Sequence, residues 1–160
     1  MVKRLFDLVV SGIGLILLAP VFLLVAPLIK LDSPGPVFYK GNRIGKGGVP
    51  FKMFKLRTMV LHADRMGSLL THEQDPRVTR AGRVLRKWKI DELPQLINVF
   101  RGEMSLVGPR PESPPYVQHY NEAQRKVLEV KPGITGPAQV KYRNEESLLS
   151  RCADLEGEYL

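Results

Sequence analysis

Two adjacent acidic residues, Asp91 and Glu92, are the side chains best suited to chemistry, and they are followed closely by Pro94. Acids at this kind of position often only cap a helix and interact favourably with its dipole. A second interpretation is catalytic, because a carboxylate close to several cations stays ionised and can ligate Mg²⁺ or attack phosphorus. The neighbouring carboxylate can hold the metal while the first attacks. Both interpretations remain open at this point.

A row of arginines precedes the acidic pair, at Arg77, Arg80, Arg83 and Arg86. A spacing of three places them along one face of a helix, where like charges repel each other. Such a row favours an anionic partner, and guanidinium groups match the oxygens of phosphate. The alternative is a solvated basic face that rests on anionic lipid. Phosphoryl transfer needs mainly positioning and charge neutralisation, which arginines and Mg²⁺ together provide.

Three further cations lie in segments that could hold an anion. Arg110 has a proline on each side, which restricts the backbone and reduces the entropy lost on binding. Lys55 and Arg57 alternate with apolar residues in the stretch FKLRTM. The alternative for Arg110 is a structural loop that carries an incidental arginine.

The chain has 160 residues, 24 Lys and Arg against 16 Asp and Glu, and a net charge of +8, which favours polyanionic partners. Nucleic acid is disfavoured, because Asp91 and Glu92 beside the arginine row would repel it. Cys152 is the only cysteine, so no intramolecular disulfide can form. One cysteine and three histidines also disfavour a zinc site.

The N-terminal segment contains no charged residue from Leu8 to Ile29, roughly 33 Å of straight helix against a ~30 Å hydrocarbon core. Pro20 predicts a kink in the middle of this segment. Lys3 and Arg4 precede it and Lys30 follows, so the positive-inside rule is satisfied at both ends only if both lie in the cytoplasm. A re-entrant helix is favoured over a kinked transmembrane helix, and a cleaved signal peptide is disfavoured.

Asp7 lies at the entry to this segment, four residues after Lys3 and three after Arg4. These positions share a helical face, so an ion pair can form there. The alternative is a carboxylate that lies unpaired among the lipid headgroups.

The remaining pattern predicts a mostly α fold with a small β element (α+β). A hairpin is expected from residues 37–39 and 51–54, separated by a glycine-rich turn. The helices are expected at 60–70, at 75–87 with Asp75 as N-cap, from Asp91 to an end at Gly102, at 121–130, and from Glu145 onward.

Five segments also resemble a known family. They are KRLFDLVVS, FKMFKLRTM, DPRVTRAGRVLRKWKIDELPQLINVF, MSLVGPRPE and KPGITGPAQV, in that order from Lys3 to about Asn144. This order is similar to that of the monotopic bacterial sugar transferases, which are phosphoglycosyl transferases. Five ordered motifs are far more specific than any one of them.

The resemblance implies that a sugar-1-phosphate moves from a UDP-sugar to polyprenyl phosphate with release of UMP, the first membrane step of exopolysaccharide or glycoconjugate synthesis. It implies that Asp91 attacks the β-phosphate and forms an aspartyl-phosphosugar intermediate, and that Glu92 assists with Mg²⁺. Arg86, Arg110 and Arg143 resemble the family's phosphate or nucleotide contacts.

The resemblance also implies a re-entrant helix over 1–30, broken at Pro20, and a catalytic domain over 31–160 on the cytoplasmic face of the inner membrane. The partners it implies are UDP-sugar, polyprenyl phosphate and anionic lipid, with a homodimer compatible and nucleic acid not expected. Ala19 replaces the family's serine, Tyr142 replaces its usual glycine, and the C-terminus at Leu160 is expected to be truncated. The rival hypotheses are a membrane-tethered basic binding module and an inactive scaffold.

Overall fold

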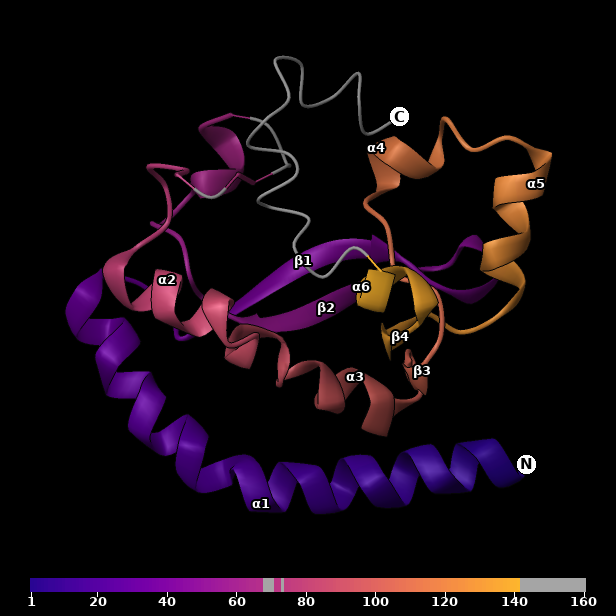
Figure 1. Cartoon of the computed structure of the whole chain (residues 1–160), viewed down its shortest axis with the longest axis horizontal. Helices are drawn as coiled ribbons and strands as arrows, with labels where there is room; N and C mark the ends of the chain where they lie inside the picture. The colour runs from indigo at the N-terminus through magenta and orange to yellow at the C-terminus, as the bar shows by residue number, and fades with distance from the viewer. Residues whose placement is uncertain (68–70, 73, 142–160) are drawn as a thin grey trace.

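The computed structural model describes residues 1–67, 71–72 and 74–141. The fold is α+β, as predicted, with about half of the chain helical and two small sheets. A long helix, α1 (Val2–Asp32), runs along one side of the molecule, and α3 (Gln95–Arg101) lies between it and the hairpin (Figure 1). The second half of α1 bends upward beside α2 (Arg80–Lys87).

The predicted hairpin is confirmed. Strands β1 (Phe38–Ile44) and β2 (Pro50–Leu56) pair antiparallel, with Phe38 opposite Leu56. The turn between them contains a 3₁₀ segment, η1 (Lys46–Gly48), in which the backbone adopts φ values of 70° and 77° at its two glycines. Only glycine adopts such angles readily, so the glycine-rich sequence selects this turn.

A second sheet was not predicted. Strands β3 (Ser105–Val107) and β4 (Gly133–Thr135) pair in parallel, and each is three residues long. The two backbones approach so closely that a Cβ atom on Gly133 would lie 2.1 Å from the amide nitrogen of Gly108. Glycine is therefore required where this pair meets.

Several predicted helix boundaries are wrong. Within the described part of 60–70 the structure contains only a short 3₁₀ turn, η2 (Ala63–Arg65). The helix expected from residue 75 begins at Arg80, with the Thr79 side chain accepting a hydrogen bond from the Gly82 amide as the true N-cap. Asp75 instead forms an ion pair with Arg77, at 2.6 Å, which favours a turn over a helical start.

The acidic pair lies in its own 3₁₀ turn, η3 (Ile90–Glu92), so α3 begins four residues later than predicted. The predicted end at Gly102 is confirmed, where φ is 86°. The helix predicted at 121–130 begins as expected, because Asn121 and Gln124 form a capping box, and it tightens into a 3₁₀ turn. The remaining elements are α4 (Pro114–Val117), α5 (Glu122–Arg125), η4 (Lys126–Glu129) and α6 (Pro137–Lys141).

Helix α1 is one continuous element that contains Pro20 and Pro27, and it bends along its length (Figure 1). A re-entrant break at Pro20 stays a prediction. By length and composition, α1 is the one helix among the described residues that could cross a membrane. Its domain-facing positions include Asp7 and Ser11 near the start and Val25 and Ile29 near the end. Its outer face is apolar and exposed, with Leu5, Phe6, Val9, Ile13, Ile16, Leu17, Leu23, Leu24, Leu28 and Leu31.

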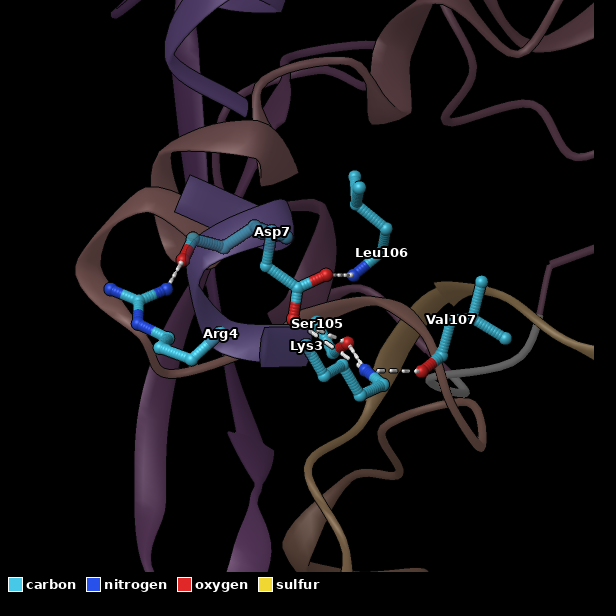
Figure 2. Close-up of polar contacts among 7 residues, drawn as sticks. Lys3, Arg4, Asp7, Ser105, Leu106 and Val107 are labelled. Atoms are coloured by element: carbon cyan, nitrogen blue, oxygen red, sulfur yellow. Dashed lines mark hydrogen bonds and ion pairs between the residues drawn. The ribbon is translucent and has the colours of Figure 1, made fainter. Parts of the chain in front are cut away.

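The start of α1 is clamped to the domain by an ionic network (Figure 2). Asp7, only 4% exposed, accepts hydrogen bonds from the Ser105 hydroxyl at 2.8 Å and the Leu106 amide at 3.1 Å. Lys3 pairs with Asp7 at 3.5 Å and also donates to the Ser105 hydroxyl. Of the two alternatives that the sequence left open for Asp7, the structure therefore shows the ion pair, with Lys3 as the partner.

Arg4 extends this clamp to the end of α3. Its guanidinium donates to the carbonyl oxygens of Val99 at 2.6 Å and Phe100 at 2.8 Å. These carbonyls belong to the last turn of α3, where the helix dipole favours a cation. The start of α1 is thus attached to both α3 and β3.

The far end of α1 is attached to the same domain. Val25 and Ile29 pack with Leu56 and Leu85 in one core cluster. Arg57, which is 5% exposed, donates hydrogen bonds to the carbonyl oxygens of Ile29 and Ser33. Both ends of the helix are therefore held by one body of the protein.

Replacing Asp7 with alanine should lower the free energy of unfolding by about 2 kcal/mol, because the hydroxyl and amide that it satisfies stay buried without an acceptor. The expected decrease in Tm is roughly 4–8 °C. Urea and thermal unfolding of the detergent-solubilised protein would measure both. Glu129→Ala, at an exposed carboxylate, is the control; equal stability of the two variants would show that the clamp contributes little.

Candidate active site

The two acidic residues lie where α2 turns toward α3. Lys89, immediately before η3, has a left-handed backbone with φ of 55°, which is uncommon for a residue with a side chain. Such a residue costs on the order of 1 kcal/mol or more and is found mainly where function over-determines the backbone. The turn directs Asp91 inward at the end of the arginine-bearing helix.

Asp91 is buried, with 5% of its surface exposed. Its Oδ1 atom has no hydrogen-bond donor among the residues that the structure describes. Burial raises the pKa of this carboxyl, and the negative charge of Glu92 raises it further, while Lys55 and Arg86 oppose part of the change. Loss of hydration makes a carboxylate more basic, so Asp91 has the properties of a nucleophile or metal ligand.

Glu92 is held in a different way. Lys55 donates a hydrogen bond to its Oε1 at 2.8 Å, and Arg110 approaches the same oxygen at 3.9 Å. Burial alone would raise the pKa of Glu92, but these two cations overcome it and lower the pKa to about 2. The two neighbouring carboxyls therefore have pKa values displaced in opposite directions, a pattern typical of sites that divide acid–base or metal-binding roles.

The four arginines of the predicted row do not share one role. Arg77 does not belong to α2, because its guanidinium binds Asp75 and the Ala63 carbonyl oxygen. Arg80 and Arg83 are exposed on α2. Arg86 is partly buried and lines the same cavity as Asp91. Of the predicted row, the structure brings Arg86 to the carboxylates.

The other predicted site residues are placed as follows. Lys55 and Arg110 meet at Glu92. Arg57 lines the cavity, but its guanidinium is bound to carbonyl oxygens at the end of α1, including that of Pro34. A substrate contact for Arg57 stays a prediction. Arg143 lies outside the described residues.

A cavity of about 200 Å³ contains Asp91, Lys55 and Arg86 in its wall. A smaller cavity of about 20 Å³ lies on the Glu92 side and is lined also by Arg110. The two cavities share Arg43, Met53 and Lys55. Lys55 thus stands between a space that reaches Asp91 and a space that reaches Glu92.

The sequence pattern missed three polar residues of the smaller cavity, Arg43, Gln95 and Gln139. Gln95 is only 3% exposed and lies with Asn98 on the buried face of α3. A glutamine in a short stretch rich in apolar residues is a signal for a buried polar group that needs a partner. Arg43 and Gln139 have no such signal, because only the fold brings β1 and α6 to this cavity.

Replacing Lys55 with methionine should raise the pKa of Glu92 above its value of about 2, because the hydrogen bond and the nearest positive charge are both lost. A ¹³C NMR titration of the glutamate carboxyl groups would measure this change. Lys52→Met, at an exposed lysine on the same strand, should leave that titration unchanged. An unchanged Glu92 titration in Lys55→Met would contradict the role given to Lys55.

Several known proteins are similar in sequence to this chain over most of its length. UDP-glucose:undecaprenyl-phosphate glucose-1-phosphate transferase from Caulobacter vibrioides is 46% identical over 87% of this chain and 53% of its own length. UDP-N-acetylgalactosamine-undecaprenyl-phosphate N-acetylgalactosaminephosphotransferase from Aeromonas hydrophila is 44% identical over 87% of this chain and 34% of its own length. Exopolysaccharide production protein ExoY from Sinorhizobium fredii is 42% identical over 94% of this chain and 74% of its own length.

The chain therefore spans between about a third and three quarters of the length of these relatives. Their names specify two different sugars, glucose and N-acetylgalactosamine, so similarity alone does not assign a sugar. The family model described as "Bacterial sugar transferase" matches residues 1–160, the full chain. The sequence motifs, the site that they form and this match agree: the chain belongs to the bacterial sugar transferase family.

Proposed function

We propose that this protein transfers a sugar-1-phosphate from a UDP-sugar to undecaprenyl or another polyprenyl phosphate and releases UMP, as a first membrane step in exopolysaccharide or glycoconjugate synthesis. The observation that carries the proposal is the unpartnered Oδ1 of buried Asp91 beside Glu92, Lys55 and Arg86. A buried carboxylate oxygen without a donor is costly, and active sites are where such costs are found.

Two displacements at phosphorus account for the reaction. Asp91 Oδ1 attacks the β-phosphorus of the UDP-sugar, the bond from that phosphorus to the bridging oxygen breaks, and UMP leaves with the bonding electrons. The sugar phosphate is then held on Asp91 as an acyl phosphate. A phosphate oxygen of the polyprenyl phosphate attacks the same phosphorus, and the Asp91 carboxylate is released to complete the cycle.

The surrounding cations suit this chemistry. Phosphoryl transfer is accelerated mainly by positioning and by neutralising charge on the phosphate oxygens. Arg86 lies at the cavity of Asp91, and Arg110 enters from the loop after β3 on the Glu92 side. Glu92 stays ionised at neutral pH because Lys55 and Arg110 hold its pKa low.

The same carboxylates fit a magnesium ion. Mg²⁺ is usually held by one or two carboxylates together with substrate phosphates, and Asp91 and Glu92 supply that number. Glu92 is ionised and can supply a ligand oxygen, which leaves the unpartnered Oδ1 of Asp91 for attack on phosphorus. Bound there, Mg²⁺ would neutralise charge on the diphosphate of the donor.

We also infer that α1 enters and leaves the same face of the bacterial inner membrane, with the domain in the cytoplasm. Its two ends are held by one domain, through Asp7 and Arg4 at the start and Arg57 at the end. A helix of 31 residues that spanned the bilayer would place its ends about 46 Å apart on opposite faces. Its outward apolar face suits partial immersion in lipid.

Asp91→Asn should reduce UMP release by at least about a thousandfold, because the amide is not a nucleophile toward phosphorus. The assay uses the full chain in detergent or nanodiscs with Mg²⁺, polyprenyl phosphate and a panel of UDP-sugars. Glu122→Gln, at an exposed carboxylate on α5, is the matched control and should retain wild-type turnover. Equal turnover of Asp91→Asn and wild type would exclude the covalent mechanism.

Single cysteines at Val2, which is 85% exposed, and at exposed Glu129 would test the membrane topology in a Cys152→Ser background. Both should react with a membrane-impermeant maleimide only after the spheroplasts are permeabilised. A periplasmic cysteine reporter in the same cells confirms that the reagent reaches the outer face. Labelling of Val2→Cys in intact spheroplasts would show instead that α1 spans the membrane.

A further inference from the structure

The larger cavity has two chemically different sides. One group of lining residues carries charge and includes Asp91, Lys55 and Arg86. A second group is apolar or aromatic, with Phe38 and Tyr39 from β1 and Met59, Val60 and Leu61 from the segment after β2, although polar residues such as Thr58 and His62 lie among them. The proposed reaction uses only the charged side, so the apolar side needs a separate explanation.

The apolar side is exposed at its mouth. Phe38, Tyr39 and Leu61 are 38%, 43% and 44% exposed, although all three are large and mostly apolar. His62, at the same mouth, has a left-handed backbone with φ of 62°. Exposed apolar residues gathered around a cavity are typical of ligand sites, and strained residues often accompany them.

This mouth is continuous with the membrane helix. The Phe22 ring of α1 packs edge-on against Phe38, with the ring centroids 6.4 Å apart. Leu61 lies beside the turn that follows α1, where a Cβ on Gly35 would be 3.3 Å from its Cδ1 atom. Two apolar residues of the cavity lining, Phe38 and Leu61, therefore lie next to α1 and the turn that follows it.

The smaller cavity, on the Glu92 side, has a more polar lining than the larger cavity. It is lined mainly by polar and charged groups, including Arg110, Gln95 and Gln139. Such groups suit a sugar or a nucleoside diphosphate rather than a hydrocarbon chain. The two cavities meet at Lys55.

We propose that the apolar part of the larger cavity, formed by Phe38, Tyr39 and Leu61, binds the isoprene units next to the phosphate of the polyprenyl acceptor. The acceptor phosphate then lies toward Asp91, Lys55 and Arg86, where the donor's β-phosphate lies in the first step. The rest of the donor extends toward Glu92, where the cavity of about 20 Å³ is too small to enclose it. At about 200 Å³ the cavity is smaller than the roughly 300–1,000 Å³ pockets that enclose whole ligands. It therefore holds only the first part of the lipid, and the remaining chain stays in the bilayer.

This inference rests on the proposed transferase function, and Leu61→Gln tests it kinetically. An amide at the mouth removes apolar contact and should raise the KM for polyprenyl phosphate about tenfold. The KM for the UDP-sugar should change less than about twofold, because its side of the site is untouched. Val49→Gln, at a 62% exposed residue in the β1–β2 turn, is the control and should change neither constant.

A rise in the KM for the UDP-sugar instead would overturn the proposal and assign the aromatic mouth to the nucleoside. Unchanged KM values for both substrates would also overturn it. Tyr39→Ser provides a second variant at the same mouth, so a folding defect confined to Leu61→Gln does not decide the result.

A second experiment needs no turnover. A polyprenyl phosphate that carries a photoreactive group on its first isoprene unit is crosslinked to the full chain in nanodiscs, and the labelled peptides are mapped. Labelling at residues 38–39 and 59–61 supports the lipid site even if no donor is turned over, in which case only the transferase proposal fails. Labelling confined to α1 or to the Glu92 side would overturn the lipid site while leaving the transferase proposal intact.

Discussion

Two neighbouring carboxylates withdrawn from water are the constraint on which the arrangement of the domain depends. Burial opposes ionisation of both Asp91 and Glu92, and their proximity adds repulsion. The opposing charge comes from three separate segments, with Lys55 on β2, Arg86 on α2 and Arg110 after β3. No single helix or hairpin could supply all three, so the hairpin, α2 and the parallel strand pair must converge on one turn. The unequal supply of cations leaves Glu92 tightly held and Asp91 with a free oxygen.

The membrane helix reverses the usual amphipathic pattern, since its inner face carries Asp7 and Ser11 while its outer face is apolar. This reversal is expected where lipid, and not water, lies outside. A polar group facing hydrocarbon is costly, so Asp7 is turned toward the domain, where Ser105 and Leu106 satisfy it. The contacts of Lys3, Arg4 and Asp7 also help to position the site. They hold the end of α3, whose start follows Glu92, and the strand that leads to the Arg110 loop.

Local chemistry made some features predictable and left others hidden. The hairpin, the end of α3 at Gly102 and the helix start at Asn121 depend on residues close together in sequence, and each was predicted. The pairing of Lys3 with Asp7 is equally local, and the sequence offered it as one of two alternatives. The pair β3–β4 was missed because three-residue strands carry no periodicity and their pairing depends on distant glycines. The start of α2 was misplaced because Asp75 had a competing partner in Arg77, which the spacing alone did not reveal.

Within the site, the sequence identified the carboxylates and several cations, but it could not separate Lys55, which contacts Glu92, from Arg57, which holds the end of α1. Strand β2 ends at Leu56, which lies between them.

The different contacts of Lys55 and Arg57 have a mechanical consequence. Lys55 and Arg57 are two residues apart, yet Lys55 binds Glu92 of the candidate site and Arg57 binds the end of α1. The position of α1 on the domain and the position of Glu92 are therefore coupled through residues 55–57, at and just after the end of β2. The phosphate of a membrane lipid cannot leave the interface, so its nucleophilic oxygen reaches the enzyme at a nearly fixed height. A site that serves such a substrate must hold its own reacting atoms at that height, and a rigid strand anchored to the membrane helix provides this more reliably than a loop.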